Sequence, residues 1–195
     1  MPPIILGSQS PRRKEILSFF NISFKQHSSN FDEEAVPFTG DPSEYVTILS
    51  KSKASILSSI YPEAVILTAD TVVYQDNKIY GKPKDTIDAF RILSELSGRW
   101  HSVYTGLTVT QGKMQYHKVE ETAVLFNDLT IDQIESYIER CHLLDKAGSY
   151  GIQTGAGLPV KKIHGCYYNV MGLPINALRE LFFEVGIDLW QYIKE

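Results

Sequence analysis

The chain has 195 residues, of which 43% are hydrophobic and 22% charged, and its formal net charge is −4. That composition supports a folded core in one domain or two small lobes and argues against disorder. The acidic balance, without a basic stripe, argues against a protein that binds bulk nucleic acid. No apolar run is long enough to span a membrane, and the beginning lacks signal-peptide features. Cys141 and Cys166 form no CxxC pair, so we expect free thiols, no zinc site and a cytoplasmic protein.

The first half of the chain alternates strand and helix patterns. Apolar runs bounded by polar turns predict strands at Ile4–Leu6, Ile22–His27 and Ala64–Tyr74. Capping residues before prolines, or apolar residues at i, i+3, i+4 and i+7, predict helices over residues 10–17, 41–59 and 86–96. Residues 28–34 are expected to form an acidic loop, and Asp76-Asn77 a tight turn.

The second half begins with a long predicted hairpin. Its strands are Ser102–Thr110 and Met114–Phe126, joined through residues 111–113. Thr130 should cap a helix that places Ile131, Ile134, Ile138 and Cys141 on one face. A glycine-rich loop, a strand, a helix and a short turn are expected over residues 148–157, 166–172, 174–185 and 189–193. The mixture predicts an α/β fold on a mixed sheet, with a cleft where loops following the strands gather.

Two adjacent arginines, Arg12 and Arg13, fall in the first turn of the first predicted helix. The helix dipole disfavours a cation there by about 0.3–1 kcal/mol, and the free N–H groups at a helix start attract anions. A bound phosphate would satisfy the dipole and the guanidinium groups together. The alternative is a pair of solvated surface arginines.

Asp70 interrupts the most apolar predicted strand, between Thr68 and Thr71. Burying a carboxylate without partners costs several kcal/mol, so Asp70 needs a cation, a metal or a place in a cleft. A structural role, in which it bonds loop amides, is the alternative. Lys53 shares a face with apolar residues of the preceding helix, and its ammonium either reaches solvent along that face or enters the same cleft.

Three further segments carry weaker signals. Lys82 follows a glycine and precedes a proline, which would present it as a fixed cation, although no Walker P-loop motif exists. The acidic loop with Glu33 suits Mg²⁺ or Mn²⁺, or is simply solvated. Gln153, in the glycine-rich loop, can donate and accept hydrogen bonds, which suits recognition of a base edge. The alternative is that this segment is a plain structural loop. Cations and carboxylates in this combination are what metal-assisted attack on a polyphosphate needs.

Six ordered blocks, "LGSQSPRRKEIL", "ADTVV", "GKP", "LSGRWHSVYTG", "DKAGSYGIQ" and "YYNVMGLP", resemble the Maf family of nucleoside triphosphate pyrophosphatases. The resemblance implies a single Maf-like domain over residues 1–195, with two lobes around a cleft and a fold similar to the inosine triphosphate pyrophosphatases. It also implies hydrolysis of a nucleoside triphosphate to the monophosphate and pyrophosphate with Mg²⁺ or Mn²⁺, and a homodimer.

The resemblance also implies roles for individual residues. Asp70 would be the catalytic carboxylate and a metal ligand, and Glu33 its acidic partner at the metal. The phosphate-binding set would be Ser8, Arg13, Lys53 and Lys82. Thr154 and Met171 depart from the family pattern, but neither is among these residues.

Within the family, Arg12, Thr71 and Gln153 match the branch that acts on dTTP and UTP. The branch that acts on 7-methyl-GTP typically carries Trp, Gln and Glu at these places. We therefore expect a pyrimidine nucleotide pyrophosphatase. A 7-methyl-GTP pyrophosphatase, a nucleotide-binding regulator of division with little turnover, and a protein-interaction module are the alternatives.

Overall fold

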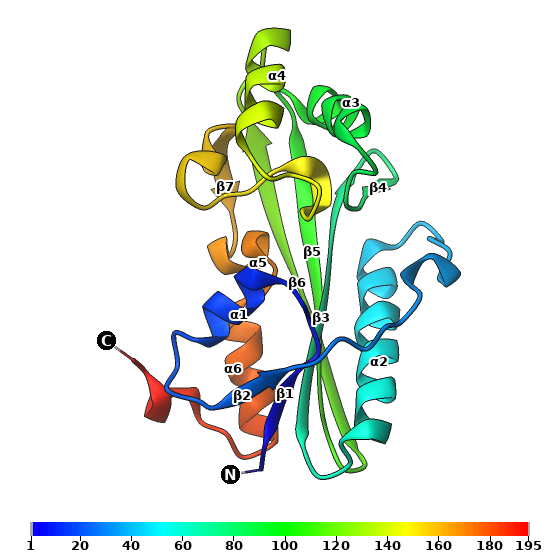
Figure 1. Cartoon of the computed structure of the whole chain (residues 1–195), viewed down its shortest axis with the longest axis vertical. Helices are drawn as coiled ribbons and strands as arrows, with labels where there is room; N and C mark the ends of the chain where they lie inside the picture. Colours follow the sequence, from blue (N-terminus) through cyan, green and yellow to red (C-terminus); the bar gives the residue numbers. More distant parts are fainter. Residues whose placement is uncertain (1, 195) are drawn as a thin grey trace.

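The computed structural model describes residues 2–194. Within them, a seven-stranded sheet has the strand order β2-β1-β3-β5-β6-β7, and β4 also pairs with β3. The strands are β1 (Ile4–Leu6), β2 (Phe24–Gln26), β3 (Val65–Gln75), β4 (Lys78–Tyr80), β5 (Trp100–Gln111), β6 (Met114–Phe126) and β7 (Val160–His164). The long strands β3, β5 and β6 run along the axis of an elongated molecule (Figure 1).

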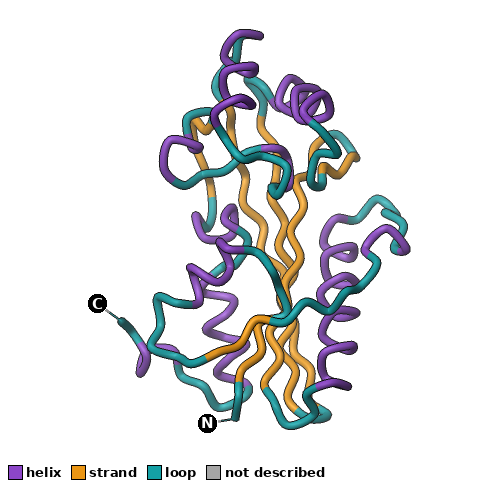
Figure 2. The backbone as a smooth tube through the Cα atoms, in the orientation of Figure 1, coloured by secondary structure: helices purple, strands orange, loops and turns teal. Residues whose placement is uncertain are grey.

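Helices cover both faces of this sheet (Figure 2). The α-helices are α1 (Pro11–Leu17), α2 (Pro42–Ile60), α3 (Thr86–Leu96), α4 (Ile131–Arg140), α5 (Tyr167–Met171) and α6 (Ile175–Glu184). Short 3₁₀ turns are η1 (Glu33–Ala35), η2 (Ala147–Ser149), η3 (Thr154–Gly157) and η4 (Leu189–Tyr192). In Figure 1, α2 lies on one side of the strands, α1 and α6 lie on the other, and α3 and α4 lie at the far end. No helix within residues 2–194 has the length and apolar character needed to cross a bilayer.

The predicted α/β class with a mixed sheet is confirmed. Strand β1 runs parallel to β2 and β3, whereas β3, β5, β6 and β7 are joined by antiparallel pairing. The turn between β3 and β4 uses Asp76 and Asn77 at φ of 50° and 60°, the positive values that a tight hairpin turn requires. The long hairpin of β5 and β6 closes between the paired residues Gln111 and Met114.

The prediction of a strand over residues 166–172 was wrong, because α5 occupies Tyr167–Met171. The aromatic composition of this segment is typical of strands, but tertiary contacts decide its structure. Gly172 ends the helix at φ 102°, a left-handed conformation that glycine adopts without strain. The side chain of Asn169 is fully buried and bonded to the sheet, which fixes the short helix in place.

In the second half, one strand was not predicted and one predicted helix face was partly wrong. The segment Val160–His164 forms strand β7 beside β6, although it carries no clear strand pattern. Ile131, predicted on the buried face of its helix, is exposed, and Cys141 lies one residue beyond the end of α4. Ile134 and Tyr137 are the buried residues of α4.

The edge of β3 that faces β1 and β4 is only partly covered. Strand β5 pairs along the whole opposite edge. On the open side, β1 covers Val65–Leu67 and β4 covers Val73–Gln75. Among the strands that the structure describes, none pairs with residues 68–72 on that side. The gap leaves Asp70 and Thr71 beside the loop that follows β1.

Candidate active site

A cleft of about 640 Å³ lies at this gap in the sheet. The predicted site residues that line it are Ser8, Arg12, Arg13, Glu33, Lys53, Asp70, Thr71 and Lys82. Gln153 is the exception among the described residues, because the cleft lining ends at Ile152 of the same loop. Its Nε2 instead donates to Oε2 of Glu15 at 3.0 Å. The fold therefore brings residues that are distant in the sequence together in one cleft.

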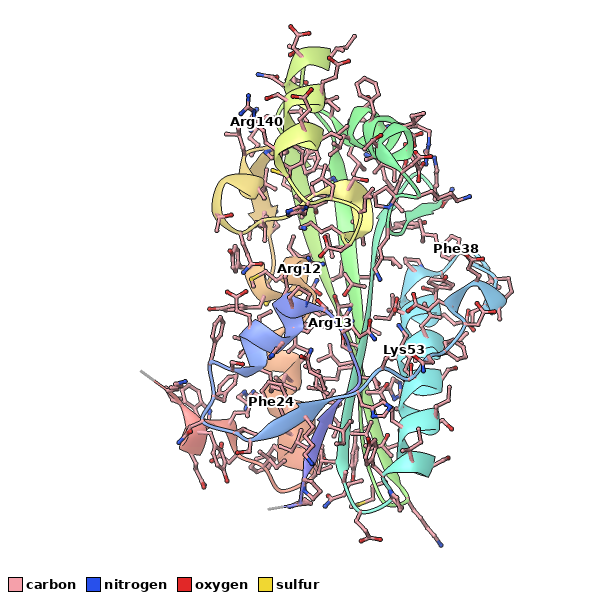
Figure 3. All side chains as sticks on the ribbon, viewed as in Figure 1. Arg12, Arg13, Phe24, Phe38, Lys53 and Arg140 are labelled. Atoms are coloured by element: carbon pink, nitrogen blue, oxygen red, sulfur yellow. The ribbon has the colours of Figure 1, made fainter. Side chains whose placement is uncertain are left out.

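Two successive residues of β3 contact residues on opposite sides of the cleft. Side chains alternate between the faces of a strand, so Asp70 and Thr71 point in opposite directions. Asp70 meets Lys53 of α2, and Thr71 meets Arg13 of α1. Figure 3 shows Lys53 on α2 and Arg13 on α1, with the long strands between the two helices.

Helix α2 lies close enough to the sheet to bury Lys53. At Gly106 of β5, opposite Asp70 in the strand pairing, an added Cβ would lie 2.5 Å from the backbone oxygen of Val46. Glycine is therefore required for this close approach. The approach brings the face of α2 that carries Tyr45 and Lys53 into the cleft.

Lys53 sits between two carboxylates. Its Nζ is 2.5 Å from Oδ1 of Asp70 and 2.7 Å from Oε1 of Glu33. The Lys53–Asp70 pair is buried, whereas the Glu33 side chain is half-exposed. Burial raises the pKa of Asp70 above its ordinary value, against the opposing attraction of Lys53. Burial also acts to raise the pKa of Glu33, but Lys53, Lys82 and Arg13 together lower it.

Within residues 2–194, the partly buried guanidinium of Arg13 forms its hydrogen bonds with neutral groups alone. Its Nε donates to the backbone oxygen of Gly172 at 2.8 Å, and its two terminal nitrogens donate to Ser8 Oγ at 3.2 Å and Thr71 Oγ1 at 2.9 Å. No carboxylate among residues 2–194 forms an ion pair with it. Burial lowers the pKa of Arg13, yet an arginine stays charged at neutral pH. Among the described residues, the guanidinium therefore has no anionic partner.

Arg12 points elsewhere and already has an anionic partner. Its guanidinium donates to Oδ2 of Asp145 at 2.7 Å and to the backbone oxygen of the same residue at 3.1 Å. Lys146 contacts the other carboxylate oxygen at 2.6 Å. The Arg12–Asp145 and Glu15–Gln153 contacts both join α1 to the loop of residues 145–153. Adjacent residues of a helix point about 100° apart, which explains why the two arginines have separate surroundings.

The residues of the cleft lining to which sequence reasoning assigned no role include Asp145 and Tyr45. Tyr45 could have been found, because it lies two helical steps of four residues before Lys53 and so shares its face. Asp145 had no comparable signal, since its contact with Arg12 spans 133 positions of sequence.

The carboxylates of Asp70 and Glu33 could hold a divalent cation. Each contacts the same Lys53 nitrogen through one oxygen, so the two carboxylates lie close together in the cleft, and the second oxygen of each forms no ion pair among residues 2–194. Among residues 2–194, no group of three or more His, Cys, Asp or Glu side chains is arranged to hold a metal. Mg²⁺ commonly binds through one or two carboxylates together with substrate phosphates and waters. The donor set therefore fits a metal that is completed by its substrate.

The fold and the cleft together define the class of protein: an α/β protein with a cleft in which cations surround a buried carboxylate. Such an arrangement suits a polyphosphate ligand. A family profile described as Maf-like protein (Maf) matches residues 3–185. The chain belongs to the Maf family.

Curated relatives match almost the whole chain. It is 45% identical over 193 residues to a dTTP/UTP pyrophosphatase of Chlamydia caviae, which covers 98% of both proteins. It is 39% identical over 191 residues to a dTTP/UTP pyrophosphatase of Chlamydia trachomatis serovar D, with 97% of each covered. A nucleoside triphosphate pyrophosphatase of Chlamydia pneumoniae is 41% identical over 192 residues, also with 97% of each covered.

Two solved structures align with the chain at low TM-scores. The Ham1 protein of Staphylococcus aureus has a TM-score of 0.44 and 15% identity, covering 98% of this chain and 93% of that chain. A nucleoside-triphosphatase, or dITP/XTP pyrophosphatase, of Mycobacterium abscessus has a TM-score of 0.40 and 12% identity, covering 64% of this chain and 74% of that chain.

Proposed function

We propose that the protein is a nucleoside triphosphate pyrophosphatase that hydrolyses dTTP and UTP to the monophosphate and pyrophosphate. The observation that carries the proposal is Arg13, a cation that has no anionic partner within the described part of the chain. It lines a cleft that also contains the buried Lys53–Asp70 pair. A triphosphate would supply the missing negative charge. The names of the 45%- and 39%-identical relatives support this substrate class.

In the proposed reaction, water attacks the α-phosphorus, the bond between that phosphorus and the bridging oxygen breaks, and pyrophosphate leaves. Asp70 is the group proposed to take the proton of the attacking water, because burial raises its pKa and general bases work best with a pKa nearer the working pH. Arg13 and Lys82 are proposed to bind the phosphate chain. Ser8, which is bonded to Arg13, is proposed to contribute its hydroxyl to the same set.

Lys53 has two tasks in this proposal. Its ammonium holds Asp70 in position from the buried side and neutralises Glu33 until substrate enters. The two carboxylates would then hold Mg²⁺ or Mn²⁺ with the substrate's phosphate oxygens, and the cation would stabilise the charge that develops on those oxygens.

Choice of the nucleotide is proposed to depend on Arg12, Thr71 and Gln153. Arg12 lines the cleft, which supports direct contact with a nucleotide. Gln153 lies outside the lining and is bonded to Glu15, so a role in base recognition requires it to exchange that partner. The proposal extends to modified pyrimidine nucleotides as substrates of the same site. The homodimer and the cytoplasmic location stay predictions.

Pyrophosphate release from a panel of nucleotides with Mg²⁺ or Mn²⁺ tests the proposal. We expect dTTP and UTP to be hydrolysed faster than CTP, GTP and 7-methyl-GTP. Faster hydrolysis of 7-methyl-GTP would favour the other branch of the family. Tight binding of UTP without pyrophosphate release would favour a nucleotide-binding regulator instead.

A further inference from the structure

The orientation of Arg13 depends on Thr71, and Thr71 in turn has a buried partner with no role so far. That partner is Thr105 of β5, which is fully buried and lies directly opposite Thr71 in the pairing of β3 with β5. Their hydroxyl oxygens are 2.9 Å apart. Residues opposite each other in an antiparallel pair share a face of the sheet, so Thr105 stands directly behind the threonine that Arg13 contacts.

One direction of the hydrogen bonds around Thr105 gives each hydroxyl hydrogen an acceptor among the described residues. Arg13 can only donate, so Thr71 Oγ1 accepts its N–H. Among the described contacts, the acceptor for the Thr71 hydroxyl hydrogen is Thr105 Oγ1, and the acceptor for the Thr105 hydrogen is the backbone oxygen of Asn169 at 3.4 Å. If Thr105 donated to Thr71 instead, the Thr71 hydrogen would lose its acceptor. The order is therefore Arg13, Thr71, Thr105, Asn169.

The end of this chain is fixed by α5. The side-chain amide of Asn169 is fully buried and donates to the backbone oxygen of Val103 at 2.9 Å and to Thr122 Oγ1 at 3.0 Å. Gly172, at the end of the same helix, accepts directly from Arg13 Nε. Helix α5 thus holds the guanidinium at two points, one direct and one through the two threonines.

We propose that Thr105 is a positioning residue for substrate binding, which orients the Thr71 hydroxyl as an acceptor and so aims Arg13 at the phosphate chain. The inference rests on the proposed function, and it extends that function to a buried residue that lies outside the cleft lining. A hydroxyl rotates freely and can present either a lone pair or a hydrogen. Thr105 removes that freedom by accepting the hydrogen.

Substitutions at Thr105 separate positioning from packing. Thr105→Val keeps the shape of the side chain and removes the hydroxyl that accepts from Thr71. We expect KM for UTP to rise by about tenfold, the effect of one lost hydrogen bond in a network that holds a charged group. The value of kcat should change by less than about threefold. Thr105→Ser restores the hydroxyl and should return KM to within about twofold of the original value. Thr108→Val is the matched control, because Thr108 is also buried on β5 but its hydroxyl pairs with Ser50.

A double substitution tests the route through Thr71. Because both residues act on the same guanidinium, Thr71→Val combined with Thr105→Val should raise KM no more than Thr71→Val alone. Binding of inorganic triphosphate, measured by calorimetry, should weaken in parallel with KM. This second measurement keeps the test valid if UTP is not the substrate, because it needs no turnover.

Three results would overturn the proposal: an effect of Thr105→Val equal to that of Thr108→Val, no rescue by Thr105→Ser, or additive effects of the two threonine substitutions. Failure of the proposed function would give a different result. The unmodified protein would then release no pyrophosphate from UTP, while the threonine variants would still show the expected differences in binding of inorganic triphosphate.

Discussion

Replacing Lys53 by methionine removes the cation that lies between two carboxylates. Methionine is close in length to the lysine stem and preserves most of the packing of α2 against the sheet. The charge that the substitution leaves behind is that of Asp70, which is 6% exposed and 2.5 Å from the lysine nitrogen. Glu33 is 2.7 Å from the same nitrogen, but its side chain is 49% exposed.

The two contacts differ in their contribution to stability. Breaking a buried pair by removing one partner costs about 3–5 kcal/mol, because the remaining charge is uncompensated. A half-exposed pair contributes at most about 1 kcal/mol. Lys53→Met should therefore lower the free energy of unfolding by about 3 kcal/mol or more near neutral pH, whereas Glu33→Gln should lower it by less than about 1 kcal/mol. The penalty of Lys53→Met should shrink at acid pH, where Asp70 is protonated and needs no cation.

Urea denaturation of Lys53→Met, Asp70→Asn and the double variant measures the coupling directly. Because Asp70→Asn removes the buried charge, adding it to Lys53→Met should recover much of the lost stability, giving a coupling energy above about 1.5 kcal/mol. Additive losses, or a Glu33→Gln penalty as large as that of Lys53→Met, would refute the reasoning. The urea m-values show whether each variant unfolds as the original protein does.

Three further predictions concern other residues. His101 is buried, and burial lowers its pKa to about 4. Below about pH 6.5 the unfolded chain therefore binds a proton that the folded chain does not. The free energy of unfolding should fall by up to roughly 3 kcal/mol between pH 6.5 and 4. His101→Phe should flatten that dependence in urea titrations, and an unchanged slope would assign it to other groups. Arg13→Ala should raise KM for every nucleotide, whereas Arg12→Ala should change their ranking; identical kinetic profiles would contradict the division between the arginines. Gln153→Glu should reduce kcat/KM for UTP and dTTP more than for other nucleotides at unchanged thermal stability, and equal losses would remove Gln153 from base selection.

Much of the site was predictable because it depends on local chemistry. Asp70 stands out as a charge in an apolar strand, and Lys53 as a cation on the apolar face of a helix. A buried charge requires a partner, so each residue signalled a cleft or an ion pair. In the structure Lys53 and Asp70 form an ion pair with each other, so one contact provides the partner that each buried charge requires.

The remaining features depend on contacts between distant parts of the chain. Helix α5 is too short to show a helical period, and it is fixed by bonds from Asn169 to strands more than 40 positions away. The partner of Arg12, Asp145, is 133 positions away in the sequence. Gln153 was predicted to read a base edge, from its residue type and from the family resemblance. Its contact with Glu15 depends on the path of the glycine-rich loop, which the sequence does not show.

The central claim is that Asp70 acts on the water that attacks the nucleotide. The most direct measurement is pyrophosphate release from UTP by Asp70→Asn, with Mg²⁺ or Mn²⁺, alongside calorimetric binding of UTP. The claim predicts that kcat falls by about 10²–10⁴-fold, the usual contribution of a general base, while UTP still binds through Arg13 and Lys82. A variant that binds UTP and retains full turnover would contradict it.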